Sequence, residues 1–139
     1  LDIGFLRKAP SAVVNKNSEG FVLEGVKHFV QFAHVADNIL VFASEEGSPE
    51  PVWLVVDSKA PGVDVTHLRT TAEDHQCHVT FSKVSVPAKN VLQAGPVAWS
   101  TLERLVARGA GATCAYLCGA MRKVLEFTTE YAKTRVQFG

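Results

Sequence analysis

Neither sign of charge dominates this chain of 139 residues. Lys and Arg together number 14, Asp and Glu also number 14, and no run of five like charges occurs. Proteins that bind nucleic acid or anionic membrane surfaces usually carry a basic patch or stripe. The sequence has no such feature, so we expect neither a nucleic-acid partner nor a membrane partner. The hydrophobic content of 47% is instead sufficient for a folded core.

Cysteine is scarce, and its spacing excludes the common redox and metal-binding motifs. Cys77, Cys114 and Cys118 form no CxxC pair, and their odd number argues against a disulfide framework. Cys114 and Cys118 are four apart on one face of a predicted helix, which suits small buried side chains. A reducing cytoplasm is the expected compartment.

Long hydrophobic runs and leader sequences are also missing. The most apolar stretch, residues 105–121, is about one helical turn too short for a membrane span and contains Arg108. The sequence shows no initiator Met, signal peptide or transit peptide, and it opens on LDIGFL as though cut from a longer chain. We therefore expect no membrane insertion.

Motifs for nucleophilic catalysis and phosphate binding are absent too, since no GxSxG, P-loop or GxGxxG occurs. Glu103, early in the predicted helix, is better explained as a charge that complements the helix dipole than as a base. Five histidines offer metal ligands, but no pair has the HxxxH spacing of one helical face. We favour isolated surface or junction histidines over a metal site; they are His28, His34, His67, His75 and His78.

The first two thirds of the chain has the pattern of β-strands. Apolar segments alternate with clusters of Asn, Gly, Ser and Pro; the segments are residues 9–14, 20–30, 38–44, 51–57, 60–65 and 77–87. In the last segment the apolar phase shifts from Val79 and Phe81 to Val84 and Val86, which predicts a bulge at Ser82–Lys83. Strands without intervening helices predict a small antiparallel sandwich or barrel and exclude parallel βαβ units.

The last third changes to a helical period. Its length of roughly thirty residues exceeds an average globular helix, and Ser100 or Thr101 is the expected N-cap. A small β-domain cannot cover so long an apolar stripe, so the helix is expected to belong to a bundle. The predicted class is α+β, with a β-domain at 1–97 and the first helix of a truncated helical bundle at 98–139. The stripe comprises Leu102, Leu105, Val106, Gly109, Thr113, Tyr116, Ala120, Val124, Phe127 and Tyr131.

Three segments, in this order, resemble the acyl-CoA dehydrogenase family. They are GVKHFVQ at 25–31 with Ala36-Asp37 after it, VTFSKVSVPAKNVL at 79–92, and YAKTRVQFG at 131–139. The family patterns are G-x-K-x-[W/F]-I-[T/S] followed by A-D, V-x-F-x-x-V-x-V-P-x-x-N-x-L, and Y-A-x-x-R-x-Q-F-G. The resemblance implies the middle β-domain of a three-domain fold, followed by the first helix of its C-terminal four-helix bundle.

The resemblance also implies FAD as the cofactor, with one group of contacts in the first segment. Phe29 would face the isoalloxazine ring, Val30 would supply backbone beside it, and Gln31 would lie near the reactive edge. An aromatic face can stack on a flat ring, and a hydrogen-bond donor near a flavin tunes its electronics. Gln31 departs from the usual Thr or Ser. The alternative, without the resemblance, is that Phe29 is an inward-facing strand residue.

A second group of implied contacts follows the helix. There Arg135 would offer a planar fork to the phosphate oxygens of FAD bound mainly by a neighbouring subunit. Gln137 would add an amide, Phe138 an apolar wall and Gly139 a close backbone turn. The alternative is a basic last helical turn with a glycine stop.

The family implies an oxidoreductase of fatty-acid metabolism that acts on the CH–CH group of an acyl-CoA thioester, as a homo- or heterotetramer. Its expected partners are acyl-CoA, a neighbouring subunit and an electron-accepting flavoprotein. No catalytic residue is assigned within the chain, because the usual glutamate would lie beyond Gly139. Cys77, His78 and Ala110 replace residues that the family often uses. Two alternatives therefore stay open: a degenerate, non-catalytic partner subunit, or a related flavin monooxygenase or oxidase.

Overall fold

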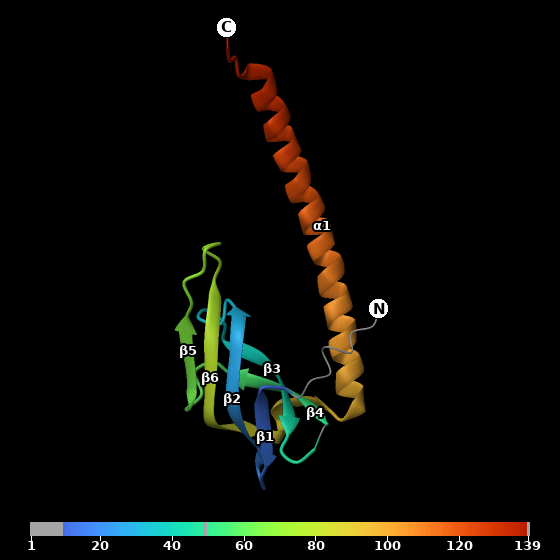
Figure 1. Cartoon of the computed structure of the whole chain (residues 1–139). Helices are drawn as coiled ribbons and strands as arrows, with labels where there is room; N and C mark the ends of the chain where they lie inside the picture. The colour runs from blue at the N-terminus through green and yellow to red at the C-terminus, as the bar shows by residue number, and fades with distance from the viewer. Residues whose placement is uncertain (1–9, 49, 139) are drawn as a thin grey trace. The chain divides into compact units, whose positions relative to one another are not determined.

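The computed structural model describes residues 10–48 and 50–138 (Figure 1). The chain forms two compact units, the first up to Ser100 and the second from Thr101. The first unit is a β-sheet followed by the start of a long helix, and the second unit is the remainder of that helix.

One seven-stranded sheet makes up most of the first unit, in the order β5-β6-β2-β1-β3-β4-β7. Strands β1 and β3 are parallel, and the other neighbouring pairs are antiparallel. This one parallel pair departs from the expected pattern. The chain reverses after β1 and again after β2, so β3 runs in the direction of β1, and β3 pairs with β1 and not with β2. The elements are β1 (Ala12–Lys16), β2 (Gly20–Gln31), β3 (Asn38–Glu45), β4 (Pro51–Asp57), β5 (Val63–His67), β6 (Gln76–Pro87), η2 (Ala88–Asn90) and β7 (Val91–Ala94).

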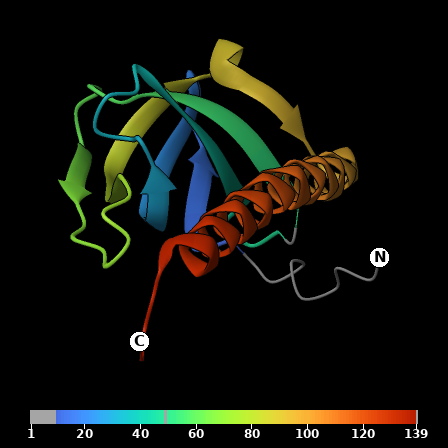
Figure 2. The same ribbon diagram turned by 90° about the horizontal axis from the view of Figure 1, so that it is seen from above.

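The sheet curls around a hydrophobic core (Figure 2). Strands β4 and β6 contact each other although three strands separate them in the sheet order. Asn90 in η2 donates a hydrogen bond from Nδ2 to the carbonyl oxygen of Val55 in β4, at 3.1 Å. The predicted α+β class, a small antiparallel sandwich or barrel followed by one long helix, is confirmed, and its β part is a single curled seven-stranded sheet. The largest fully buried apolar side chains include Val14, Leu23, Val41, Leu54, Val79 and Val84.

The predicted bulge in β6 is confirmed. Strand β6 contains one more residue than β2 at Ser82–Lys83, where the pairing register shifts. Val79 and Phe81 are buried on one side of the shift, and Val84 and Val86 are buried on the other. The extra residue thus keeps the apolar side chains of both halves of the strand directed into the core.

Helix α1 (Pro96–Thr134) begins earlier than expected. Gly95, with φ of 79°, turns the chain out of β7, and Pro96 then occupies the first helical position. Proline suits that position because its φ is fixed near the helical value and its missing N–H has no partner there anyway. The prediction of Ser100 or Thr101 as the N-cap is therefore wrong, since both lie within the helix.

Aromatic side chains hold the first turn of α1 against the sheet within the first unit. The indole Nε1 of Trp53 donates to the carbonyl oxygen of Ala98 at 3.1 Å, and this bond is buried. The ring of Phe42 lies 4.7 Å from that of Trp53 and 5.1 Å from that of Trp99, centroid to centroid. A buried indole N–H needs such a partner, so this contact positions the start of the helix.

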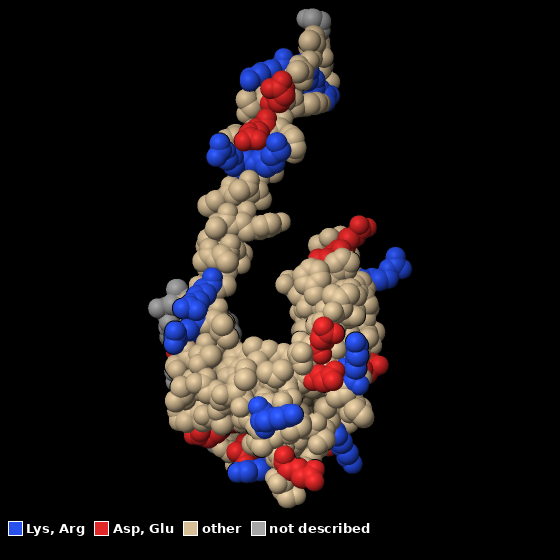
Figure 3. Space-filling model, turned by 180° about the vertical axis from the view of Figure 1, so that it is seen from behind, with Lys and Arg blue, Asp and Glu red and all other residues tan. Residues whose placement is uncertain are grey.

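The second unit exposes the apolar stripe of α1. Between Arg108 and Arg122 the helix carries no charged residue, and this stretch is uniformly tan in Figure 3. Cys114 and Cys118 are exposed, contrary to the expected burial, because a single helix has nothing of its own to pack against. Among the described residues no helix is long and apolar enough to cross a membrane. The exposed apolar side chains include Leu105, Tyr116, Leu117, Met121, Val124, Leu125, Phe127 and Tyr131.

Candidate functional site

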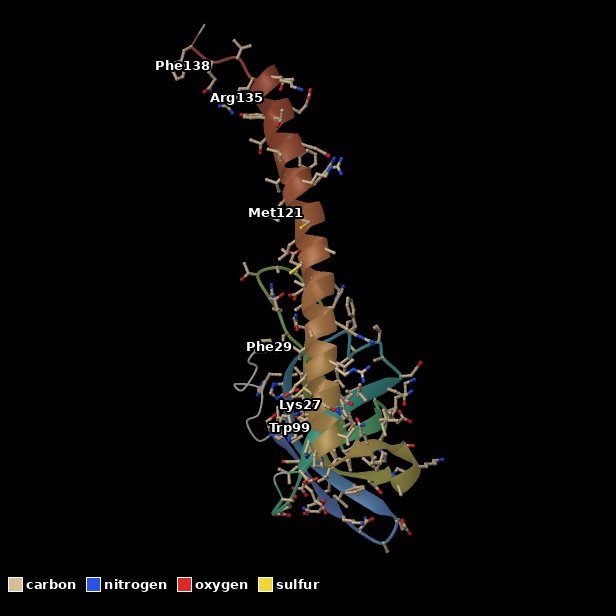
Figure 4. The ribbon with its side chains drawn as sticks, turned by 90° about the vertical axis from the view of Figure 1, so that its right-hand side faces the viewer. Lys27, Phe29, Trp99, Met121, Arg135 and Phe138 are labelled. Carbon is tan, nitrogen blue, oxygen red and sulfur yellow. The ribbon has the colours of Figure 1, made fainter. Side chains whose placement is uncertain are left out.

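A second β-bulge lies near the end of β2. Between Lys27 and Val30 this strand has one more residue than its partner β6. Phe29 lies in that interval with φ of 58°, in the left-handed region that costs a non-glycine residue roughly 1–2 kcal/mol. Its side chain is 71% exposed (Figure 4). Bulges re-aim side chains next to active sites, and strained residues concentrate at functional sites.

The three residues predicted from the first motif lie side by side at this strand end. Phe29 is exposed, which excludes the alternative that it is an inward-facing core residue. Val30 is half-buried and packs against the core. Gln31 is exposed and pairs with Gln76 at the end of the β2–β6 ladder. The strand end thus directs an aromatic ring and an amide toward solvent while Val30 fixes the backbone between them.

Lys27, just before the bulge, is partly buried (Figure 4). Burial lowers the pKa of its ammonium group, because the charged form loses hydration. Within residues 10–48 and 50–138, none of the ion pairs involves Lys27. A partly desolvated cation, with no ion-pair partner among the described residues, therefore lies two residues from the strained aromatic ring.

The turn after β2 is tied to the loop before β6. The backbone N–H of Phe32 donates to the carbonyl oxygen of His75 at 2.9 Å, and their rings lie 5.6 Å apart. Phe32 is a second exposed phenylalanine with positive φ, here 57°. A hollow of about 320 Å³ opens beside this turn, and Asp37 and Lys59, two of its lining residues, form an ion pair at 3.7 Å.

The residues predicted from the last motif follow the end of α1. The Arg135 guanidinium lies 5.0 Å from the centre of the Tyr131 ring. With its amide oxygen facing that guanidinium, Gln137 accepts hydrogen bonds from Nε at 3.3 Å and Nη2 at 2.5 Å. Phe138 is fully exposed (Figure 4), and Gly139 lies outside the described residues. The structure therefore brings Arg135 and Gln137 together, with an exposed apolar ring beyond them.

Three of the five histidines converge, which corrects the expectation of isolated residues. Nitrogen atoms of His34, His67 and His75 all lie within 4.8 Å of one another. His28 and His78 form a separate pair, with ring centroids 4.5 Å apart. No local sequence signal could have revealed the three-histidine cluster, because its members belong to the turn after β2, the end of β5 and the loop before β6.

Comparison with known proteins gives a consistent relationship. Residues 6–84 match the family described as the middle domain of acyl-CoA dehydrogenase. The acyl-CoA dehydrogenase FadE27 of Mycobacterium tuberculosis is 36% identical over an alignment of 124 residues, and the match covers 86% of this chain and 30% of FadE27. The chain spans about a third of the length of the curated relatives it matches.

Two solved structures share both sequence and fold with the chain. The ChsE4–ChsE5 complex from Mycobacterium tuberculosis has a TM-score of 0.73 at 29% identity, covering 93% of this chain and 34% of its counterpart. A variant of the Tcur3481–Tcur3483 steroid ACAD has a TM-score of 0.71 at 32% identity, covering 94% and 34% respectively.

Replacing Lys27 by methionine tests the cost of its buried charge. Because the folded-state pKa is lowered, the unfolded chain binds the proton more tightly, and the charge destabilises the fold at neutral pH. Lys27→Met should therefore raise the free energy of unfolding at pH 7. The gain should shrink as the pH rises through the lowered pKa toward about 10.4, the ordinary lysine value. Chemical denaturation across this range measures it.

The exposed Lys16, in β1 of the same sheet, provides the matched control. Lys16→Met should change the free energy of unfolding little and show no comparable pH dependence. An equal gain from both variants would mean that burial of the Lys27 charge is not the cause.

Proposed function

The chain belongs to the acyl-CoA dehydrogenase family through its middle domain, and we propose that it is part of an FAD-dependent enzyme that α,β-dehydrogenates an acyl-CoA thioester. The observation that carries the proposal is Phe29, an exposed aromatic residue held at positive φ by a bulge. Packing within the sheet does not account for such a residue. A flat ligand lying against its ring does.

The residues of the strand end fit the ring system of FAD. The Phe29 ring is free to stack on an isoalloxazine, and the Val30 backbone is held beside it by pairing with β6. The Gln31 amide would donate a hydrogen bond near the reactive edge. When bound, FAD supplies the two-electron acceptor for hydrogens removed from adjacent carbons of the substrate. Phe29 and Gln31 would orient that acceptor.

The residues at the helix end fit the opposite, anionic part of the same cofactor. The Arg135 guanidinium presents planar N–H donors that suit phosphate oxygens, and its contact with Tyr131 limits how it can turn. Phe138 offers an exposed apolar wall. We infer that this group serves FAD bound mainly by a neighbouring subunit, so that cofactor binding depends on assembly. Acyl-CoA and an electron-accepting flavoprotein complete the proposed partners.

A second candidate is a non-catalytic subunit of a two-component enzyme. ChsE4–ChsE5 and Tcur3481–Tcur3483 are named as paired proteins. Cys77, at a position where the family often contacts acyl-CoA, is fully buried and cannot present its side chain to a substrate. In this role the chain would contribute contacts from Arg135, Gln137 and Phe138 to the FAD bound by its partner.

Replacing Phe29 by glycine tests the ring contact. Loss of one aromatic contact should weaken flavin binding roughly two- to tenfold. The melting temperature should change little, because relief of the positive φ offsets the greater entropy of the unfolded chain. Flavin absorbance after gel filtration and thermal denaturation measure the two effects. Phe32→Gly relieves a similar φ of 57° outside the proposed contact; equal flavin loss in both variants would exclude the role of Phe29.

Replacing Arg135 by alanine tests the second group. In the assembled oligomer Arg135→Ala should weaken FAD binding by roughly 1–3 kcal/mol, as for a hydrogen bond to a charged group. Lys133→Ala is the matched control, since it removes a cation of the last helical turn that forms an ion pair with Glu130 at 3.8 Å. Fluorescence titration with FAD measures both variants. Unchanged affinity in Arg135→Ala would remove this residue from the site.

Flavin stoichiometry distinguishes the two candidate functions. If the chain is part of a catalytic subunit, the purified oligomer should contain one FAD per copy of this chain. If it is part of a non-catalytic partner, a mixed oligomer should contain one FAD per two chains, and this subunit alone should contain none. Visible absorbance combined with quantitation of each chain decides between these outcomes.

A further inference from the structure

Three imidazole rings from distant parts of the chain meet at one edge of the β-sheet. His34 lies in the turn after β2, His67 ends β5, and His75 immediately precedes β6. The distances between ring centroids are 5.2 Å for His34–His67, 5.3 Å for His34–His75 and 5.8 Å for His67–His75. All three side chains are exposed, so an ion in solution can reach them.

These spacings match those of three histidines bound to one metal ion. Zinc binds imidazole nitrogen at about 2.0–2.1 Å, and a tetrahedral arrangement then places the centres of two such rings about 5 Å apart. The rings lie close to this separation in all three pairs, and a nitrogen of each lies within 4.8 Å of the others. Binding of one ion would draw the three nitrogens closer together than they lie here.

The backbone beneath the cluster is fixed by hydrogen bonds on each side. His67 is paired with Cys77 in the β5–β6 ladder, and Leu68 N–H donates to the carbonyl oxygen of Gln76 at 2.8 Å. The carbonyl oxygen of His75 accepts from the N–H of Phe32, which joins its loop to the turn that contains His34. The three ligands are therefore held near one another before any ion binds, which lowers the entropic cost of binding.

A buried thiol supports the His34 ring from below. Cys77 Sγ lies 3.6 Å from His34 Nδ1, and Cys77 is fully buried. A proton on Nδ1 directed at this sulfur leaves the Nε2 lone pair available for a metal. Such a partner on the second ring nitrogen is a regular feature of metal-binding histidines, because it fixes the tautomer and the ring orientation.

No carboxylate completes the cluster among the described residues. Asp74 is adjacent in sequence to His75, but Thr70 donates a hydrogen bond to its Oδ1, and Gln76 donates to its Oδ2 at 2.6 Å. The Asp37 carboxylate is paired with Lys59. The ligand set is thus three imidazoles and an open fourth position. Three nitrogens and one exchangeable site suit zinc, whereas Mg²⁺ and Ca²⁺ require oxygen ligands.

We propose that His34, His67 and His75 bind one Zn²⁺ ion, with water or an exogenous ligand in the fourth position. The ion joins the turn after β2, the end of β5 and the loop before β6. Since the turn follows Gln31 directly, bound zinc stiffens the strand end that carries Phe29. The proposal does not depend on the flavin function, because its three ligands are distinct from every proposed flavin contact.

Zinc titration of the metal-free protein tests the site. Competition with a chromogenic chelator should give one tight Zn²⁺ equivalent per chain, and the melting temperature should rise with zinc occupancy. Co²⁺ in place of Zn²⁺ should give the intense visible bands of a four-coordinate ion. Three single variants, His34→Ala, His67→Ala and His75→Ala, each remove one ligand. Each should weaken Zn²⁺ binding by more than the 10- to 100-fold that is typical when only a hydrogen-bond partner of a ligand is removed.

The second histidine pair supplies the matched control. His28 and His78 lie on β2 and β6, with rings 4.5 Å apart, but have no third histidine. The double variant His28→Ala/His78→Ala should keep full zinc affinity and the zinc-dependent rise in melting temperature. Circular dichroism confirms that each variant is folded. The proposal is overturned if the wild type binds no tight equivalent, or if the cluster variants bind zinc as tightly as the control.

Discussion

The long antiparallel pairing of β2 with β6 is the constraint on which the rest of the sheet unit depends. Its alternating side chains form much of the core, including Leu23, Val79 and Val84. Its far end carries the bulge that directs Phe29 into solvent, and the strand β5 that ends in His67 pairs onto its outer edge. A rigid ladder can hold a strained residue in place because many hydrogen bonds would have to break to relax it.

The helix is stabilised differently along its length. Its first turn is fixed by the buried bond from Trp53 to Ala98 and by the edge-to-face contact between the rings of Phe42 and Trp99. Farther along, the described residues stabilise the helix through its own backbone hydrogen bonds and through surface ion pairs, such as those from Glu126 to Arg122 and Lys123. Exposed pairs of this kind contribute little. That other helices cover this exposed apolar stripe, as in a bundle, therefore stays a prediction.

Local sequence pattern predicted the fold where the order of apolar and polar residues within one strand or helix reflects which side chains are buried. The phase slip between Phe81 and Val84 revealed one bulge, because the buried residues on both sides of it are apolar and their alternation visibly shifts by one position. The bulge at Phe29 produced no such shift in the apolar pattern, since the side chains of His28 and Phe29 are exposed. The helix start differs from the predicted N-cap because Pro96, a residue that suits the first helical position, precedes Ser100 and Thr101. The three-histidine cluster could not be predicted, because its contacts join residues more than thirty positions apart in the case of His34 and His67.

The two bulges of the β2–β6 pair act in opposite senses. One adds a residue to β6 and the other adds a residue to β2, and both strands contain 12 residues. Only the middle of the ladder is displaced by one position, while its two ends share a single alignment. Loss of one residue from either strand alone would turn a whole strand end to the opposite face of the sheet. Length changes in this pair are therefore compatible with the fold only when a change in one strand is matched by a change in the other.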